Sequence, residues 1–290
     1  MPKQDTILVV REKSILMQFL LQQLKGKNRD NIKSLLRNRQ VWVNGQVVSQ
    51  FNHELLPEHR VMIKWERSAE GLAGRDIRIV YEDEYIVVID KQAGLLSIAT
   101  ETEKEATAYS LLSTYLKSQN PGNRIFVVHR LDRDTSGLMM FAKSSTIQSL
   151  LQKTWQTNIS ERTYVAVVKG KVEKPQGTIR SYLYESKALM MHSTNDPAKG
   201  ELAITHYRTI RTTPDYSLLE VSLETGKKNQ IRVHMKEMGH GIAGDRKYGT
   251  GDNPFGRLGL HASVLAFLHP VTGKPLRFTS KIPAAFLKLD

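Results

Sequence analysis

The sequence predicts an α+β fold in two parts, a small helix-and-hairpin domain followed by a larger domain with a mixed, largely antiparallel sheet. Three observations support this prediction. Residues 29–40 have the apolar spacing of a helix, residues 41–48 form two β-rich runs around Asn44-Gly45, and the chain beyond residue 75 contains many strand-like runs but few helices. Strands that do not alternate with helices favour antiparallel pairing over repeated βαβ units.

The small domain is expected over residues 1–67. Apolar side chains share one face of its helix: Ile32, Leu35 and Leu36. Basic side chains recur every four residues along another face and form a basic stripe: Arg29, Lys33 and Arg37. The dipeptide Asn44-Gly45 accepts the positive φ angles of a type I′ turn and therefore predicts a tight hairpin.

The weakly patterned segment 68–74 is expected to be a linker, and the larger domain to span residues 75–290. Its first part, residues 77–90, predicts two strands around a turn at residues 82–84. Helices are expected over residues 106–118 and 145–156, and further strands over residues 163–172, 204–212 and 216–224.

The charge balance is strongly basic. The 42 Lys and Arg outnumber the 29 Asp and Glu, which gives a formal net charge of +13 and favours a polyanionic partner such as a nucleic acid. No apolar run approaches the ~18 residues of a membrane span. The chain has no cysteine, which excludes disulfides and thiolate chemistry, and its nine His show no metal-ligand spacing. We therefore expect a cytoplasmic protein without a metal or cofactor.

Residues 127–144 carry the most chemistry. Two apolar runs enclose a short polar loop in which Asp132 stands beside Arg130 and Arg133. Loops held by rigid strands often present reactive groups. The cationic neighbours should keep the carboxylate ionised, so that it could act as a nucleophile or a base. From the residues alone, Asp134 could do the same, and the whole loop could be a simple polar turn.

The first domain resembles the alpha-L RNA-binding motif of a ribosomal small-subunit protein. The resemblance covers residues 11–65 and consists of a helix, a basic stretch, the V-x-V-N-G hairpin and a final V-x-I strand. It implies contacts from Arg29, Lys33 and Arg37 to RNA phosphates, which give affinity but little sequence readout. The alternative is that this stripe is a solvated helix face.

The segment HRLDRDTSGL resembles the active-site signature of RluA-type pseudouridine synthases, H-R-L-D-x-x-T-S-G-L, at every fixed position. The resemblance implies that Asp132 is the catalytic carboxylate and that Arg130 inserts into the RNA stack where the target uridine flips out. Asp134 falls at a variable position, which implies a surface charge.

A second match lies at residues 224–249, which resemble T-G-R-x-H-Q-I-R-V-H and G-H-P-I-x-G-D-x-x-Y-G. It implies that Arg232 pairs with Asp132 and that Ile231 packs near the base. Alternating apolar and polar residues at 231–234 favour a strand there, with Arg232 and His234 pointing outward. Asn229 stands where His is usual and Gly241 where Pro is usual, which we expect to alter local RNA contacts without removing activity.

A third match, E-R-T-Y at residues 161–164, implies that Tyr164 stacks on the target uracil, although a strand Tyr is more often structural. The last match, LGLHASVLAFLHP, implies scaffold, with His261 in a structural role.

Together these matches imply a cofactor-independent enzyme, active as a monomer, that isomerises uridines in RNA. Large-subunit ribosomal RNA is the expected substrate and transfer RNA the second choice. Two alternatives remain. One is an RNA-binding or ribosome-assembly factor without turnover. The other is an aspartate-nucleophile phosphatase, because DRDTS resembles the D-x-D-x-T motif, although the expected strands do not alternate with helices as a doubly wound sheet requires.

Overall fold

The computed structural model describes residues 5–37, 40–65, 76–100, 107–249 and 251–288. It divides into two compact units, one formed by residues 1–77 and 111–123 and the other by residues 78–110 and 124–290. The predicted linker, 68–74, lies outside the described residues. Among the residues described, no helix is long and apolar enough to cross a membrane.

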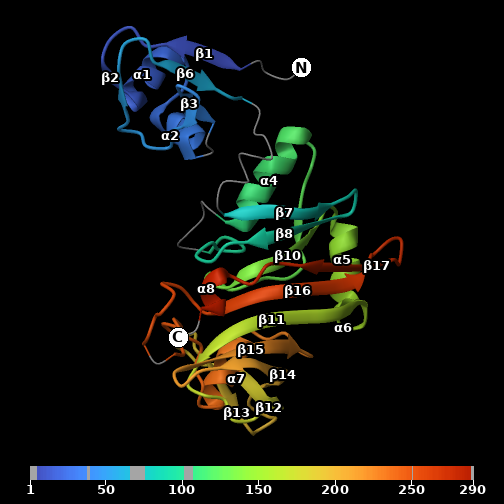
Figure 1. Cartoon of the computed structure of the whole chain (residues 1–290). Helices are drawn as coiled ribbons and strands as arrows, with labels where there is room; N and C mark the ends of the chain where they lie inside the picture. Colours follow the sequence, from blue (N-terminus) through green and yellow to red (C-terminus); the bar gives the residue numbers. More distant parts are fainter. Residues whose placement is uncertain (1–4, 38–39, 66–75, 101–106, 250, 289–290) are drawn as a thin grey trace. The chain divides into compact units, whose positions relative to one another are not determined.

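Residues 5–65 of the first unit form a four-stranded sheet and two helices (Figure 1). Its strands are β1 (Thr6–Val9), β3 (Val41–Val43), β4 (Gln46–Val47) and β6 (Arg60–Ile63), in the order β1-β6-β3-β4. The helices are α1 (Leu16–Gln23) and α2 (Arg29–Arg37), and β2 (Ser14–Ile15) pairs with β5 (Glu54–Leu55). Apolar side chains from both helices and the sheet form one core, including Leu20, Ile32 and Val61.

The predicted hairpin is confirmed. Asn44 and Gly45 have φ angles of 49° and 81°, as a type I′ turn requires, and they join β3 to β4. The predicted helix is confirmed as α2, and the Asn28 side chain accepts a hydrogen bond from the Asn31 N–H at its start. Arg29 and Lys33 are exposed on it, whereas the Arg37 side chain lies outside the described residues.

The second unit is built on an eleven-stranded sheet. Its strands are β7 (Ile77–Glu82), β8 (Ile86–Lys91), β9 (Phe126–Val127), β10 (Ser136–Ala142), β11 (Ile159–Lys169), β12 (Gln176–Glu185), β13 (Met191–Thr194), β14 (Glu201–Thr212), β15 (Tyr216–Leu223), β16 (Leu260–Leu268) and β17 (Pro275–Thr279). The order is β13-β12-β14-β15-β11-β16-β10-β8-β7, with β9 on β10 and β17 on β16. β10 and β16 run parallel, whereas antiparallel pairing predominates in the rest of the sheet, which confirms the predicted mixed, largely antiparallel sheet.

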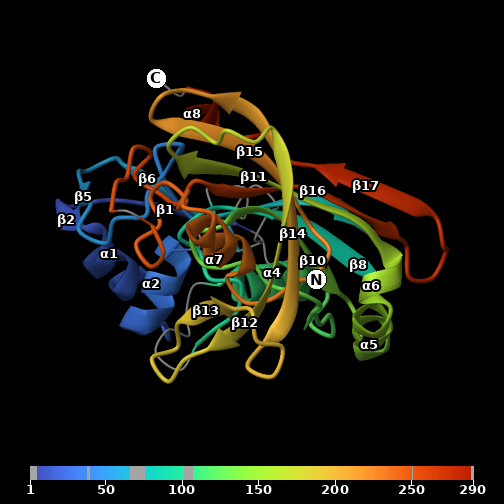
Figure 2. The ribbon, with the colours of Figure 1, turned by 90° about the horizontal axis from the view of Figure 1, so that it is seen from below.

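Helices cover parts of this sheet. The helices α5 (Ser145–Lys153) and α6 (Trp155–Asn158) lie near β10 and β11, and α7 (Gln230–Glu237) packs near β13 and β14, as Figure 2 shows. The remaining helices are α8 (Ala284–Leu287) and α4 (Ala108–Gln119), most of which is assigned to the first unit. Every residue of β10 is buried, which explains the apolar run GLMMFA.

Gly137 makes the parallel pairing of β10 with β16 possible. Its φ is +111°, and a Cβ atom there would lie 2.1 Å from the carbonyl oxygen of Ala262. Only glycine therefore allows the two strands to approach directly after the polar loop of residues 129–135. This approach fixes the loop against the start of β16.

The predicted strand at residues 231–234 is wrong, because these residues belong to α7. The helix buries Ile231, His234 and Met235, spaced three and four residues apart. The expected outward orientation of His234 is also wrong. Its side chain is fully buried, and its Nδ1 and Nε2 atoms lie 2.8 and 3.1 Å from the hydroxyls of Thr205 and Ser181.

Candidate active site

The polar loop between β9 and β10 is held by backbone contacts on both sides of Asp132. Ser97 donates a hydrogen bond to the carbonyl of Leu131 and accepts one from its N–H. Lys91 donates to the carbonyl of Arg133 at 3.0 Å. Because the residues before and after Asp132 are anchored, the position of its Cα is fixed by the surrounding fold.

Lys91 is fully buried below this loop. Its Nζ donates to the carbonyl oxygens of Gln92, Leu95 and Arg133, and these three acceptors match the three donors of an ammonium group. Burial lowers the pKa of Lys91 to about 7, although the charges of Asp134 and Asp132 oppose the shift. Lys91 therefore connects the end of β8 to the loop.

His129 is a structural residue at the start of the loop. Its Nε2 accepts a hydrogen bond from the N–H of Met140 at 3.0 Å, and its ring lies 4.9 Å from that of Trp155. Burial lowers the pKa of His129 to about 3, with a further contribution from the charge of Arg162. The imidazole is therefore neutral at physiological pH.

The cation that contacts Asp132 comes from α7. Arg232 Nη1 lies 3.1 Å from Asp132 Oδ2, although the two residues are one hundred positions apart in the chain. The local sequence pointed to Arg130 and Arg133 as charged neighbours of Asp132, whereas the family resemblance implied Arg232, and an ion pair with Arg232 is present. The Asp132 side chain remains 28% exposed, so one part of the carboxylate faces the pocket.

Arg232 is itself held by Asp245. Its Nε and Nη2 atoms donate to the two carboxylate oxygens of Asp245 at 2.8 and 2.7 Å, and the Asp245 side chain is fully buried. Burial by itself raises the pKa of Asp245, but the hydrogen bonds and charge of Arg232 outweigh it and hold that pKa below its usual range. Burial likewise tends to lower the pKa of Arg232, whereas Asp245 and Asp132 raise it. Arg232 therefore stays charged and uses its planar fork to join two carboxylates.

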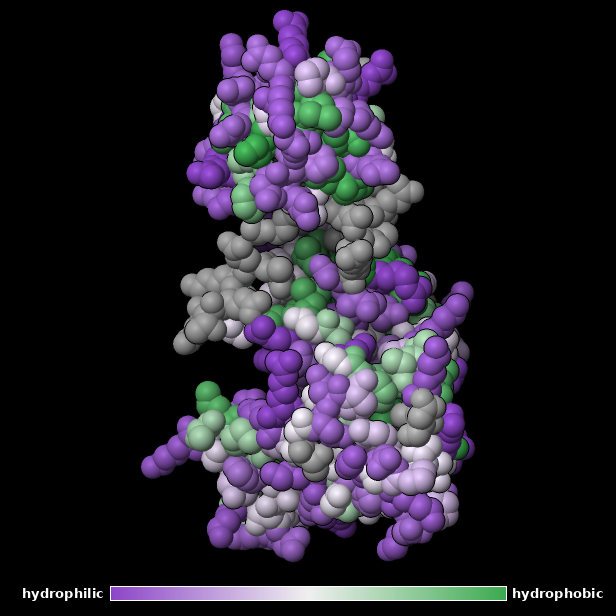
Figure 3. Space-filling view, turned by 60° about the vertical axis from the view of Figure 1, so that its left-hand side comes forward, coloured by the Kyte–Doolittle hydropathy of each residue, from purple (hydrophilic) through white to green (hydrophobic). Residues whose placement is uncertain are grey.

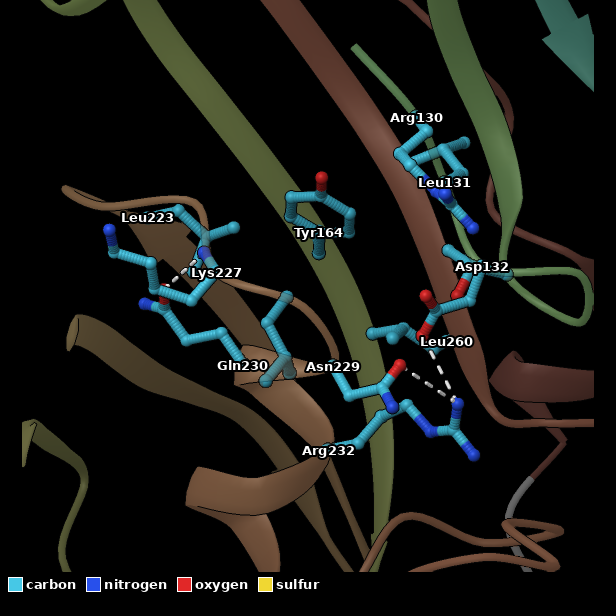
Figure 4. A pocket seen from close by; sticks show the side chains of 12 residues that line it. Arg130, Leu131, Asp132, Tyr164, Leu223, Lys227, Asn229, Gln230, Arg232 and Leu260 are labelled. Carbon is cyan, nitrogen blue, oxygen red and sulfur yellow. Dashed lines mark hydrogen bonds and ion pairs between the residues drawn. The ribbon is translucent and has the colours of Figure 1, made fainter. Parts of the chain in front are cut away.

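A pocket opens beside Asp132 (Figure 4). Its walls come from the polar loop, β11, β15, α7 with the segment before it, and β16, and they are formed by Arg130, Leu131, Asp132, Thr135, Tyr164, Leu223, Lys227, Asn229, Gln230, Ile231, Arg232 and Leu260. Asp132 is the only acidic side chain among these residues.

Tyr164 projects from β11 toward this pocket (Figure 4). Burial raises the pKa of its hydroxyl, the charge of Arg162 opposes this, and that of Asp132 adds to it, so the phenol stays neutral. Its ring packs against the core that includes Ile231 and Leu260. An aromatic ring with aliphatic side chains nearby can accommodate a flat heterocycle next to the carboxylate.

Five residues for which the sequence predicted a role in catalysis or RNA binding line this one pocket: Arg130, Asp132, Tyr164, Ile231 and Arg232. Asp134 is exposed, as expected, and His261 is buried with its Nδ1 2.8 Å from the Ser136 hydroxyl, which fits a structural role. The sequence assigned no role to Lys91, Ser97 or Asp245. Only the family-like G-D-x-x-Y-G spacing drew attention to Asp245.

Comparison with known proteins shows the family. The pattern of the RNA pseudouridylate synthase family matches residues 85–237. A Bacillus subtilis protein named "Uncharacterized RNA pseudouridine synthase YlyB" is 33% identical over 93% of this chain and 91% of its own length. The "Ribosomal large subunit pseudouridine synthase D" of Salmonella typhimurium is 32% identical over 94% of this chain and 88% of its own.

Solved structures agree on the fold. The structure of human RNA pseudouridylate synthase domain containing 4 superposes with a TM-score of 0.60 at 22% identity, covering 76% of this chain and 92% of that one. The chain therefore belongs to the RNA pseudouridine synthase family, of the RluA type. It is an enzyme that isomerises uridine in RNA.

Proposed function

We propose that Asp132 is the catalytic carboxylate and that the substrate is a uridine in large-subunit ribosomal RNA. The observation that carries the first part is that, among the described residues that line the pocket beside Tyr164 and Ile231, Asp132 is the one carboxylate. The name of the 32% identical Salmonella protein supports the second part. Transfer RNA is the second candidate substrate.

The reaction breaks the N-glycosidic bond of uridine, rotates the base and rejoins carbon 5 to the ribose. Asp132 could attack the ribose, attack carbon 6 of the uracil or remove a ribose proton. Each route needs an ionised carboxylate in a fixed direction, which the contact with Arg232 favours. Carbon 5 loses its hydrogen as a proton and nitrogen 1 gains a proton from solvent, so the isomerisation is redox-neutral, transfers no other group and needs no cofactor.

A uridine inside an RNA helix must leave the stack to reach Asp132, at a cost of a few kcal/mol. Arg130 is exposed at the edge of the pocket and could fill the vacated position in the helix. Tyr164 would then stack on the extruded uracil. In this proposal Arg130 stabilises the opened RNA helix and Tyr164 holds the extruded base.

We further infer that residues 1–67 form a separate RNA-binding domain of the alpha-L type, joined by residues 68–74 to a catalytic domain over residues 75–290. The exposed Arg29 and Lys33 on α2 and the confirmed hairpin support this inference. Figure 3 shows many hydrophilic side chains, interrupted by smaller hydrophobic groups, on the visible face, which suits contact with a charged, hydrated partner. We expect a monomer acting in the cytoplasm.

The test is pseudouridine mapping of ribosomal and transfer RNA from cells with and without the protein, complemented by Asp132→Asn or Asp134→Asn. We expect specific sites in large-subunit RNA to be lost without the protein and with Asp132→Asn, but restored by Asp134→Asn. Binding of Asp132→Asn to RNA should be nearly unchanged. Activity in Asp132→Asn, or its loss in Asp134→Asn alone, would overturn the assignment.

A further inference from the structure

Asn229 occupies an unusual place just before α7. Its backbone is left-handed, with φ 54° and ψ 20°, a conformation that asparagine tolerates better than most residues. Its side chain makes no capping hydrogen bond to the helix. It lies instead between the carboxylate of Asp132 and the hydroxyl of Tyr248.

The neighbours determine how the Asn229 amide is oriented. The backbone N–H of Met191 donates to the hydroxyl oxygen of Tyr248 at 3.0 Å. The hydroxyl hydrogen is then free to point to the other side, where the amide oxygen of Asn229 accepts it at 3.0 Å. This places the amide nitrogen against Asp132, 2.7 Å from Oδ2 and 3.1 Å from Oδ1.

The opposite orientation is the one drawn in Figure 4. It gives the amide oxygen a long, 3.4 Å contact from Arg232 Nη1 but sets this oxygen against the carboxylate oxygens of Asp132, so that acceptors face each other. When the amide nitrogen faces Asp132, the Asn229 amide, the Asp132 carboxylate and the Tyr248 hydroxyl all have a suitable partner, so this orientation is favoured.

We propose that Asn229 and Tyr248 are positioning residues for the isomerisation, which act by fixing the direction of the Asp132 carboxylate. The proposal rests on the catalytic role proposed for Asp132. Arg232 and Asn229 both donate to Oδ2, and Asn229 also donates to Oδ1. Two donors from different directions restrict rotation of the carboxylate more than the ion pair could alone.

One short segment supports both donors. Asp245 binds Arg232 through two hydrogen bonds, and Tyr248, three residues later, binds Asn229. The N–H of Tyr248 also donates to Asp245 at 3.0 Å, and the Tyr248 side chain is almost fully buried. The segment therefore holds Asp132 through a charged arm and a neutral arm.

The neutral arm has a chemical consequence. An amide donor orients the carboxylate without bringing a second positive charge beside it. An amide also does not titrate near neutral pH, unlike the His that is usual at this position in the resembling sequences. The hold on Asp132 from this side should therefore be independent of pH.

Single-turnover kinetics on a large-subunit RNA transcript with tritium at carbon 5 of uridine tests the proposal. We expect Asn229→Ala to lower the rate constant by about 10- to 150-fold, as for loss of a hydrogen bond to a charged group, with RNA affinity within about threefold of wild type. Tyr248→Phe keeps the ring and should lower the rate less. The double variant should match Asn229→Ala, because Tyr248 acts through Asn229. Asn195→Ala, at an exposed site outside the pocket, is the matched control.

The pH profile separates positioning from a general loss of structure. Asn229→Asp places a second carboxylate against Asp132, and like charges this close cannot both ionise readily. Its activity should therefore fall at low pH and recover toward pH ~9, whereas Asn229→Ala should run parallel to wild type. A wild-type rate for Asn229→Ala, or additive losses in the double variant, would overturn the proposal. Asp132→Asn serves as the separate check, since activity in that variant would instead refute the role of Asp132.

Discussion

Replacing Arg232 with lysine tests whether the planar guanidinium, and not its charge alone, prepares the site. Arg232 donates two hydrogen bonds to the buried carboxylate of Asp245 and a third to Asp132. A single ammonium cannot reproduce this geometry. We expect the lysine in Arg232→Lys to stay with Asp245, whose side chain is fully buried, and to leave Asp132 without its cation.

The magnitude follows from the contacts that are lost. One hydrogen bond between charged groups contributes roughly 1.5–3 kcal/mol. Losing the contact to Asp132 should therefore lower kcat/KM by about 10- to 150-fold. Losing one of the two bonds to Asp245 should lower the free energy of unfolding by a similar ~1.5–3 kcal/mol. Removing the charge entirely, as in Arg232→Met, leaves Asp245 buried without a counterion and should cost about 3–5 kcal/mol.

Tritium release from labelled RNA measures the change in kcat/KM, and urea denaturation measures the change in the free energy of unfolding. Arg277→Lys is a matched control, because Arg277 also contacts both oxygens of one carboxylate, that of Glu161, but on the surface. That variant should change stability by less than ~1 kcal/mol. If Arg232→Lys kept kcat/KM within about threefold of wild type while stability fell, the fork would matter for folding only and our reasoning about Asp132 would be refuted.

Three further predictions concern pH, metals and RNA affinity. Burial lowers the pKa of three histidines, to about 3, 4 and 4 for His129, His234 and His261. As pH falls, these histidines take up protons in the unfolded chain before they do so in the folded protein. The free energy of unfolding should therefore fall as pH drops from ~6.5 toward 4, by up to ~1.4 kcal/mol per pH unit per histidine. Urea denaturation at several pH values should show that the free energy of unfolding depends less on pH in His234→Asn. The same pH dependence should be unchanged in His192→Asn, at an exposed site. Activity on RNA verified as folded should persist in excess EDTA, and loss that a divalent ion restores would contradict this. Replacing Arg29, Lys33 and Arg37 by Gln in one triple variant should weaken RNA binding. The slope of log affinity against log salt concentration should become flatter by about one unit per lost phosphate contact, whereas equal affinities and parallel slopes would show that this helix face is only solvated.

The sequence was most informative where local chemistry decides structure. Asn44-Gly45 predicts its own turn, because few other pairs accept two positive φ angles. The apolar run of β10 likewise predicts a buried strand. The reactive loop could be located between two apolar runs, although the choice of Asp132 over Asp134 as the catalytic residue required the family resemblance.

The sequence was misleading where two periodicities overlap. Ile231 and Val233 alternate with polar residues as in a strand, yet Ile231 and His234 also share a helical face, and tertiary packing selected the helix. The partners of Asp132 could not be derived from spacing either. Arg232 and Asn229 reach it only through folding, and the support from Asp245 depends on a buried ion pair that no local pattern encodes.

The place of β16 in the sheet has a consequence for the order of synthesis. β16, residues Leu260–Leu268, lies between β10 and β11, although it is translated after both of them. Asp132 precedes β10 on one side of this gap, whereas Tyr164 lies on β11, on the other. A nascent chain that ends before β16 therefore lacks the strand that joins the two halves of the pocket. At ~5–20 residues per second, translation of the more than one hundred residues between Asp132 and β16 takes several seconds, so catalytic competence should appear only after β16 has been made.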